Sequence, residues 1–180
     1  MEYNQASESL YVADYSNFRV MHYTLGASSG SIVAGTGLSG IDNAHLTSPV
    51  GVYFESLSNS LIIANHLAHN IVRWPLDATN WTLIVGDING NFGNDSKTLY
   101  YPTVVVLDPM GNLYVADRNN HRIQLFMNGQ LKGITIAGIT STIGSNSTLL
   151  TVPWSVALDN QLNLYVADSA NHRVQKFLRY

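Results

Sequence analysis

Aspartate and arginine recur five residues apart in this chain, a spacing that could place a carboxylate beside a guanidinium. The pairs are Asp14 with Arg19, Asp117 with Arg122, and Asp168 with Arg173. At the equivalent positions of a fourth segment stand Asn65 and Asn70, so both charges are absent there together. Joint retention and joint loss predict a contact between the two side chains, with the carboxylate also accepting hydrogen bonds from N–H groups of the turn. A catalytic carboxylate repeated three times would be unusual chemistry, so we interpret these as structural pairs.

Histidines at recurring positions raise the question of a metal site. They are His69, His121 and His172, with His66 nearby. Zinc needs ligands that converge at roughly 2 Å, whereas equivalent turns of separate repeats are spread apart. We therefore expect these side chains to cap and hydrogen-bond their own turns, and the sequence predicts neither a metal nor a cofactor.

The charged and histidine-bearing positions belong to a segment that occurs four times. Its copies are residues 9–23, 60–74, 112–126 and 163–177. The Ala-Asp or Ala-Asn pairs within them are separated by steps of 51, 52 and 51 residues. A near-constant period is the signature of a repeat architecture. We therefore expect four copies of one structural unit.

The third copy shows how such a unit is built from strands. A β-branched run at 104–107 is followed by a Pro/Gly turn, and further strands are expected at 113–116, 123–126 and 133–137. Apolar residues three apart, such as Ile123 and Phe126, point to opposite faces of a strand, so the sheet must be covered on both faces. Four short antiparallel strands stacked against similar neighbours meet that need and predict a β-propeller blade.

The motif of this unit resembles the NHL repeat. It reads Pro-x-x-Val-x-x-Asp, then Asn-Leu-Tyr-Val-Ala-Asp, then Asn-His-Arg-(Ile/Val)-Gln-x-Phe. The Asn-His-Arg part is complete at 120–122 and 171–173, partial at 17–19 and poor at 68–70. NHL repeats form propellers, usually of six blades, so the resemblance implies an all-β propeller.

We expect a single NHL-repeat β-propeller over residues 1–180. Its blades are expected at approximately 1–35, 49–86, 102–138 and 153–180. The chain begins within a first strand and ends after a third strand, which predicts the C-terminal part of a larger propeller, about four of six blades. A self-contained four-bladed ring is the alternative. An open arc would expose apolar blade faces and an unpaired strand edge, so self-association is expected.

The long connections between the expected blades share one apolar position. They are rich in Gly, Asn, Ser and Thr, yet each carries a leucine three residues before a proline. These leucines are Leu46, Leu99 and Leu150. We expect each to anchor its loop to the core, where burial would contribute roughly 1.5–3 kcal/mol.

Composition limits the classes of function. Hydrophobic residues make up 46% of the chain and charged residues 12%, which describes a globular protein. The formal net charge of −3 gives no support for a general phosphate-binding surface, so nucleic acid is not an expected partner. The absence of cysteine excludes a disulfide framework and Cys-ligated zinc without identifying a compartment. No apolar stretch approaches the ~20 residues of a membrane span, so a membrane partner is not expected either.

Strand parity places two kinds of connection at the same end of every blade. These are the turns between second and third strands and the crossings between fourth and first strands. This end, which we call the loop face, is the expected binding surface. The candidate binding residues are Arg118, Asn119, Asn120, His121, Asn171 and His172. We interpret the chain as a non-catalytic scaffold for macromolecular recognition, with a protein as its expected partner.

The resemblance to NHL proteins implies one association and an RNA-binding alternative, and the propeller class adds an enzyme as a second alternative. Such propellers often serve as recognition domains beside a RING-type ubiquitin ligase, although no RING could lie in this cysteine-free chain. A metal-dependent peptide-amidating lyase would need converging histidines around a central metal. An RNA-binding propeller would need clustered Lys and Arg on the loop face, where only Arg118 stands out.

Overall fold

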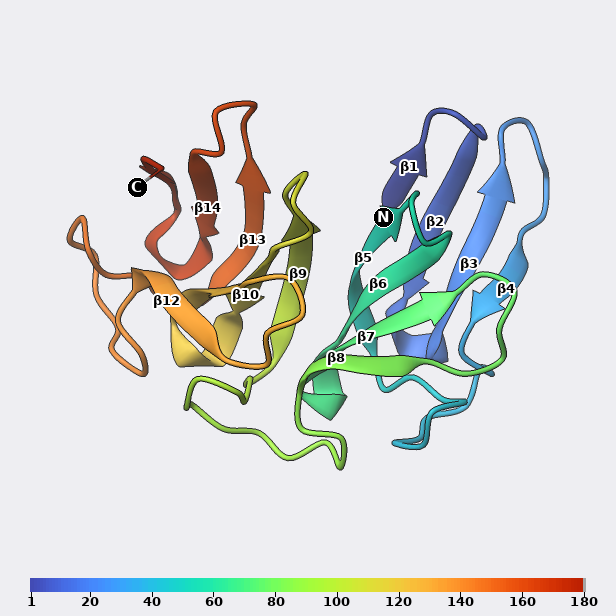
Figure 1. The fold of residues 1–180 in the computed structure, drawn as a ribbon, viewed down its shortest axis with the longest axis horizontal. Coiled ribbons are helices and arrows are strands. Elements are labelled where there is room, and N and C mark those ends of the chain that lie inside the picture. Colours follow the sequence, from blue (N-terminus) through green and yellow to red (C-terminus); the bar gives the residue numbers. More distant parts are fainter. Residues whose placement is uncertain (180) are drawn as a thin grey trace. The chain divides into compact units, whose positions relative to one another are not determined.

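The computed structural model describes residues 1–179 and consists of antiparallel sheets joined by loops and short 3₁₀ helices (Figure 1). The chain divides into two compact units, the first comprising Met1–Asn91 and the second beginning at Phe92. Each unit contains two sheets, which we call blades one to four in chain order. No helix within residues 1–179 is both long and apolar enough to cross a membrane.

The first unit contains two four-stranded blades. Blade one comprises β1 (Glu2–Asn4), β2 (Ser9–Asp14), β3 (Arg19–Thr24) and β4 (Ser31–Ala34). Blade two comprises β5 (Pro49–Glu55), β6 (Ser60–Asn65), β7 (Asn70–Pro75) and β8 (Thr82–Gly86). Strands that follow one another in the chain are paired antiparallel, so each blade is a simple meander.

The second unit has the same construction. Blade three comprises β9 (Pro102–Leu107), β10 (Leu113–Asp117), β11 (Arg122–Phe126) and β12 (Gly133–Gly138). Blade four contains three strands, β13 (Pro153–Leu158), β14 (Leu164–Asp168) and β15 (Arg173–Phe177). The prediction of an all-β fold built from propeller blades is therefore confirmed. The number of blades in a complete ring stays a prediction.

Burial explains why the strands show no alternating apolar pattern. Every residue of β6 and of β10 is buried, so both faces of these strands are covered. In the first unit, Tyr11, Leu61 and Trp74 from both blades belong to one apolar cluster. In the second unit, Ile123 and Val166 likewise share a cluster that spans both blades. The two blades of each unit are thus joined by a shared apolar cluster.

The turn between second and third strands has the same form in every blade. It is a 3₁₀ helix, at η1 (Tyr15–Asn17), η2 (His66–Ala68), η3 (Arg118–Asn120) and η4 (Ser169–Asn171). A residue with positive φ then ends each helix: Phe18 at 51°, His69 at 55°, His121 at 56° and His172 at 52°. Left-handed backbone is uncommon outside glycine, but histidine adopts it more readily than most residues. The repeated histidine therefore serves the backbone of the turn.

The crossing loops are anchored as expected. Leu46, Leu99 and Leu150 are fully buried. The Leu150 side chain lies against the α-carbon of Gly138 at the end of β12, where a β-carbon would stand 3.2 Å from the leucine methyl group. The prediction that these leucines fix the loops to the core is confirmed.

Candidate functional site on the loop face of the second unit

The Asp and Arg residues singled out by their spacing lie opposite each other on paired strands. In blade three, Asp117 on β10 is paired in register with Arg122 on β11. The carboxylate Oδ2 lies 2.8 Å from the guanidinium Nε, and the two side chains are 0% and 3% exposed. The corresponding distances are 2.8 Å in blade four and 2.9 Å in blade one. Burial raises the pKa of Asp117, and this effect outweighs the opposing effect of the Arg122 charge.

The pair in blade three also holds the crossing loop that leads into its blade. Arg122 donates hydrogen bonds to three backbone carbonyl oxygens, those of Asn94 at 3.0 Å, Asp95 at 2.7 Å and Thr98 at 3.2 Å. Asn120 donates to the carbonyl of Gly93 at 2.8 Å, and Asp117 accepts the N–H of Tyr100 at 2.7 Å. We call this set of Asp, Asn and Arg the loop staple. It binds backbone atoms of the loop.

Blade four repeats every contact with the same spacing. Arg173 donates to the carbonyls of Ser145, Asn146 and Leu149. Asn171 donates to Gly144, and Asp168 accepts the N–H of Thr151. Counted from the bound glycine, the carbonyls lie at positions +1, +2 and +5 and the N–H at +7 in both loops. The staple therefore recognises one backbone conformation twice.

Blade two achieves part of the same result without charges. Asn65 accepts the N–H of Thr47 at 2.6 Å, which is position +7 from Gly40. The carbonyl at +5, that of His45, accepts a hydrogen bond from the indole of Trp81 at 2.7 Å. Sequence reasoning missed the glycine in these loops. A signal was present, because Gly40, Gly93 and Gly144 each precede the anchoring leucine by six residues.

Several of the predicted binding residues are engaged within the protein. Asn120 and Asn171 belong to loop staples. The Nδ1 of His121 accepts the N–H of Val152 at 3.1 Å. Burial and the nearby charge of Arg118 lower the pKa of His121, which favours the neutral ring that this bond requires. His172 is exposed.

Asn119 lines a pocket of about 300 Å³, and Arg118 precedes it in the same turn; both residues are half-buried. Its lining comprises Phe92, Gly93, Asn94, Tyr100, Asn119, Asn120 and Ser141. Phe92 stacks on Tyr100 with ring centroids 4.5 Å apart, and Tyr100 stacks on Tyr101 at 4.9 Å. Next to it, the Arg118 guanidinium lies 5.3 Å from the ring centroid of Trp154. The result is a shallow aromatic and amide surface, which we call the aromatic pocket.

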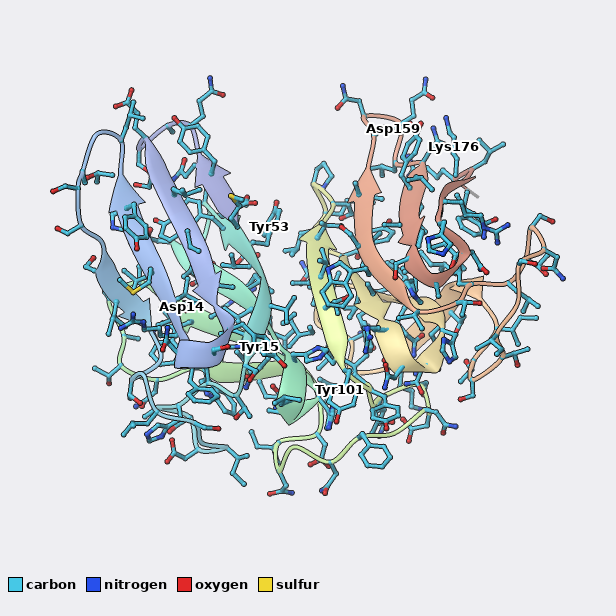
Figure 2. The ribbon with its side chains drawn as sticks, turned by 180° about the vertical axis from the view of Figure 1, so that it is seen from behind. Asp14, Tyr15, Tyr53, Tyr101, Asp159 and Lys176 are labelled. Carbon is cyan, nitrogen blue, oxygen red and sulfur yellow. The ribbon has the colours of Figure 1, made fainter. Side chains whose placement is uncertain are left out.

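A second pocket lies at the opposite end of the same unit, where the strand hairpins turn. Its volume is about 330 Å³, and its apolar lining includes Met110, Leu125, Ile134 and Phe177. Figure 2 shows Asp159 and Lys176 at this hairpin end, away from Tyr101 on the loop face. None of the candidate binding residues predicted from the sequence lines this pocket. Within residues 1–179, no three His, Cys, Asp or Glu side chains are grouped so that they could hold a metal ion.

Comparison with known proteins identifies the repeat and the fold. Residues 99–126 and 150–177 match the NHL repeat family, which confirms the resemblance read from the sequence. A search of curated proteins finds no match.

The solved structures that are similar to the chain include the following three. A protein of unknown function from Bacteroides thetaiotaomicron has a TM-score of 0.80 at 14% identity, over 98% of this chain and 46% of that one. An auxiliary nutrient binding protein from the same organism has a TM-score of 0.70 at 18% identity, over 97% and 46%. A gluconolactonase from Xanthomonas campestris has a TM-score of 0.72 at 15% identity, over 99% and 57%. The chain spans about half the length of these structures, and likeness at such low identity shows the fold alone.

Proposed function

Because this chain carries NHL repeats, we propose that it is a non-catalytic recognition scaffold that binds a protein partner on its loop face. The observation that carries the proposal is the aromatic pocket, which the crossing loop before β9 and the turn η3 build together. A role beside a RING-type ubiquitin ligase stays a prediction from the repeat.

The chemistry of the pocket suits a protein partner. Tyr, Trp, Phe and Arg are the side chains enriched at protein interfaces. Phe92 and Tyr100 stack in the lining of the pocket, and Arg118, which precedes Asn119 of the lining in the chain, lies over the ring of Trp154. Phe92 is 62% exposed, so its ring offers a large apolar area to a partner. The amide of Asn119 adds hydrogen-bonding capacity at the rim.

The rigidity of the surface also supports recognition. Tyr100 is tied to the blade through its N–H on Asp117, and Asn119 donates its own N–H to the Tyr100 carbonyl at 3.0 Å. A loop held in this way loses little conformational freedom when a partner binds. The loop staple thus supplies the preorganisation, and the aromatic side chains supply the contact area.

Peptides selected from a displayed random library on the purified chain would test the proposal. We expect their affinity, measured by fluorescence polarisation, to fall roughly tenfold in Phe92→Ala, because an exposed aromatic anchor is lost. Leu57→Ala is the matched control, since Leu57 is 98% exposed on a hairpin turn of the other unit.

The alternatives make different predictions in the same assay. Peptides whose affinity is unchanged in Phe92→Ala but falls in Met110→Ala would indicate binding at the hairpin end and would refute the proposal. A single-stranded RNA that binds the chain with a steep dependence on salt would favour the RNA-binding alternative.

A further inference from the structure

Blade one carries the same three residue types, at the same spacing, as the loop staples of blades three and four. The Asp14 Oδ2 lies 2.9 Å from the Arg19 Nε, and the Asp14 Oδ1 accepts a hydrogen bond from Asn17 at 2.8 Å. Phe18 has a φ of 51°, close to the 56° of His121. Asp14, Asn17 and Arg19 therefore repeat the residue types, the spacing and the backbone of the other two staples.

This staple differs from the others in what it binds. Within residues 1–179, Asp14 is the hydrogen-bond partner of Arg19, and no backbone N–H donates to the Asp14 carboxylate. The Asp14 side chain is 27% exposed, whereas Asp117 and Asp168 are both 0% exposed. Figure 2 shows Asp14 at the end of β2, near the turn that holds Tyr15. The groups that bind three carbonyls and one amide elsewhere face solvent here.

We propose that Asp14, Asn17 and Arg19 form a binding site for an extended polypeptide segment, which they recognise through its backbone. The segment presents a glycine carbonyl to Asn17, carbonyls at +1, +2 and +5 to Arg19, and an N–H at +7 to Asp14, as the loops on Arg122 and Arg173 do.

Two properties of the site favour binding. The guanidinium is already oriented by its bond to Asp14, so little rotamer freedom remains to be lost. Its hydrogen bonds to carbonyls are charge-assisted, which makes them stronger than neutral ones. The site lies in the first unit and reads backbone atoms, so it is independent of the aromatic pocket and goes beyond the proposed function.

A peptide with the sequence of residues 92–101, blocked at both ends, is the probe. Titrated into the ¹⁵N-labelled chain, it is expected to shift the Arg19 Nε–H and Asn17 side-chain amide resonances in a saturable way. The loops already bound in blades three and four are tethered to their staples, and their high effective concentration keeps the free peptide from displacing them.

Two altered peptides separate backbone from side-chain recognition. Methylating the backbone nitrogen of the residue that corresponds to Tyr100 removes the +7 donor, and we expect roughly tenfold weaker binding. Replacing the four residues after the glycine with those at 145–148 keeps the backbone, and we expect affinity within about threefold.

Variants of the chain identify the site. Arg19→Lys keeps the charge but removes the planar fork, and we expect roughly tenfold weaker binding with an otherwise unchanged amide spectrum. Asp14→Asn, which keeps the shape, provides a second test if Arg19→Lys disturbs the fold. Arg73→Lys, at a half-buried arginine of the same unit that is paired with Glu55, is the matched control and should bind normally. The proposal is overturned by the absence of a saturable shift at millimolar peptide, by normal binding to Arg19→Lys, or by normal binding of the methylated peptide.

Discussion

The buried staple of blade three allows the sharpest test of how this fold is held together. Arg122→Ala removes hydrogen bonds to three loop carbonyls and to Asp117. The Asp117 carboxylate would stay buried with two donors, the N–H of Tyr100 and the amide of Asn120. Removing one partner of a buried ion pair costs about 3–5 kcal/mol, because the other charge is left uncompensated. We expect a loss in that range in the free energy of unfolding.

The repeats supply matched controls for this prediction. Arg19 makes the same ion pair with a side chain that is 31% exposed and holds no loop, so Arg19→Ala should cost about 1 kcal/mol or less. Arg173 holds a loop with a side chain that is 29% exposed. The loss of unfolding free energy in Arg173→Ala should therefore lie between the losses in Arg122→Ala and Arg19→Ala. Chemical denaturation followed by circular dichroism measures the order of the three variants. Native-state hydrogen exchange at the Tyr100 amide reports whether the loop itself is released.

A double variant tests the reasoning about charge. Blade two carries Asn65 and Asn70 at these positions, so Asp117→Asn with Arg122→Asn copies an arrangement that the protein already tolerates. We expect the double variant to be less destabilised than Arg122→Ala, with a coupling energy of about 1–3 kcal/mol between the two positions. Additive single-site losses, or an Arg122→Ala variant as stable as Arg19→Ala, would refute the buried staple as a source of stability.

Two further predictions concern the turn that follows Asp117. The pKa of His121 is lowered in the fold, so its neutral form contributes stability above its ordinary pKa of about 6.5, and this contribution is lost as the pH falls below it. Asparagine in the variant His121→Asn keeps an acceptor for the N–H of Val152 and tolerates positive φ, but it does not titrate. Thermal denaturation should therefore show a smaller loss of stability between pH 7 and pH 5 than in the unchanged protein. An equal loss in both proteins would contradict this assignment. Gly138→Ala should destabilise the protein more than Gly129→Ala. Both glycines have positive φ, but a β-carbon at Gly138 would collide with the His121 carbonyl, whereas a β-carbon at Gly129 would enter open space. Equal melting temperatures of the two variants would contradict the collision.

The sequence predicted the blades better than it predicted the chemistry of the loop face. A period near 51 residues and the burial of both strand faces follow from local patterns, and these patterns indicated the repeat unit. The leucine anchors followed from the same repetition.

The roles of single loop residues could not be predicted, because they depend on contacts with distant parts of the chain. Asn120 binds a carbonyl 27 residues away, and His121 binds an amide 31 residues away. The stacking of Phe92 on Tyr100 depends on the path of a loop that carries no regular structure. In blade two, Trp81 donates the hydrogen bond to the loop carbonyl that an arginine donates in blades three and four. Within residues 1–179, no tryptophan does this in the other repeats, so no periodic signal in the sequence indicates it.

The backbone contacts of the loop staple have a consequence for how such a surface can change. Between the bound glycine and the leucine anchor, the first four side chains in blades three and four are exposed, and their residue types are Asn, Asp, Ser and Lys in one loop and Ser, Asn, Ser and Thr in the other. The staple fixes the path of each loop through backbone atoms, and the side chain at +2 adds local hydrogen bonds: Asp95 accepts the N–H groups of Lys97 and Thr98, and Asn146 accepts those of Thr148 and Leu149. Mutation can therefore replace the side chains at the other exposed positions and keep the framework beneath them, provided that a short acceptor stays at +2. In this respect the crossing loops are exchangeable inserts on a constant support, and they are natural positions for grafting a chosen recognition sequence.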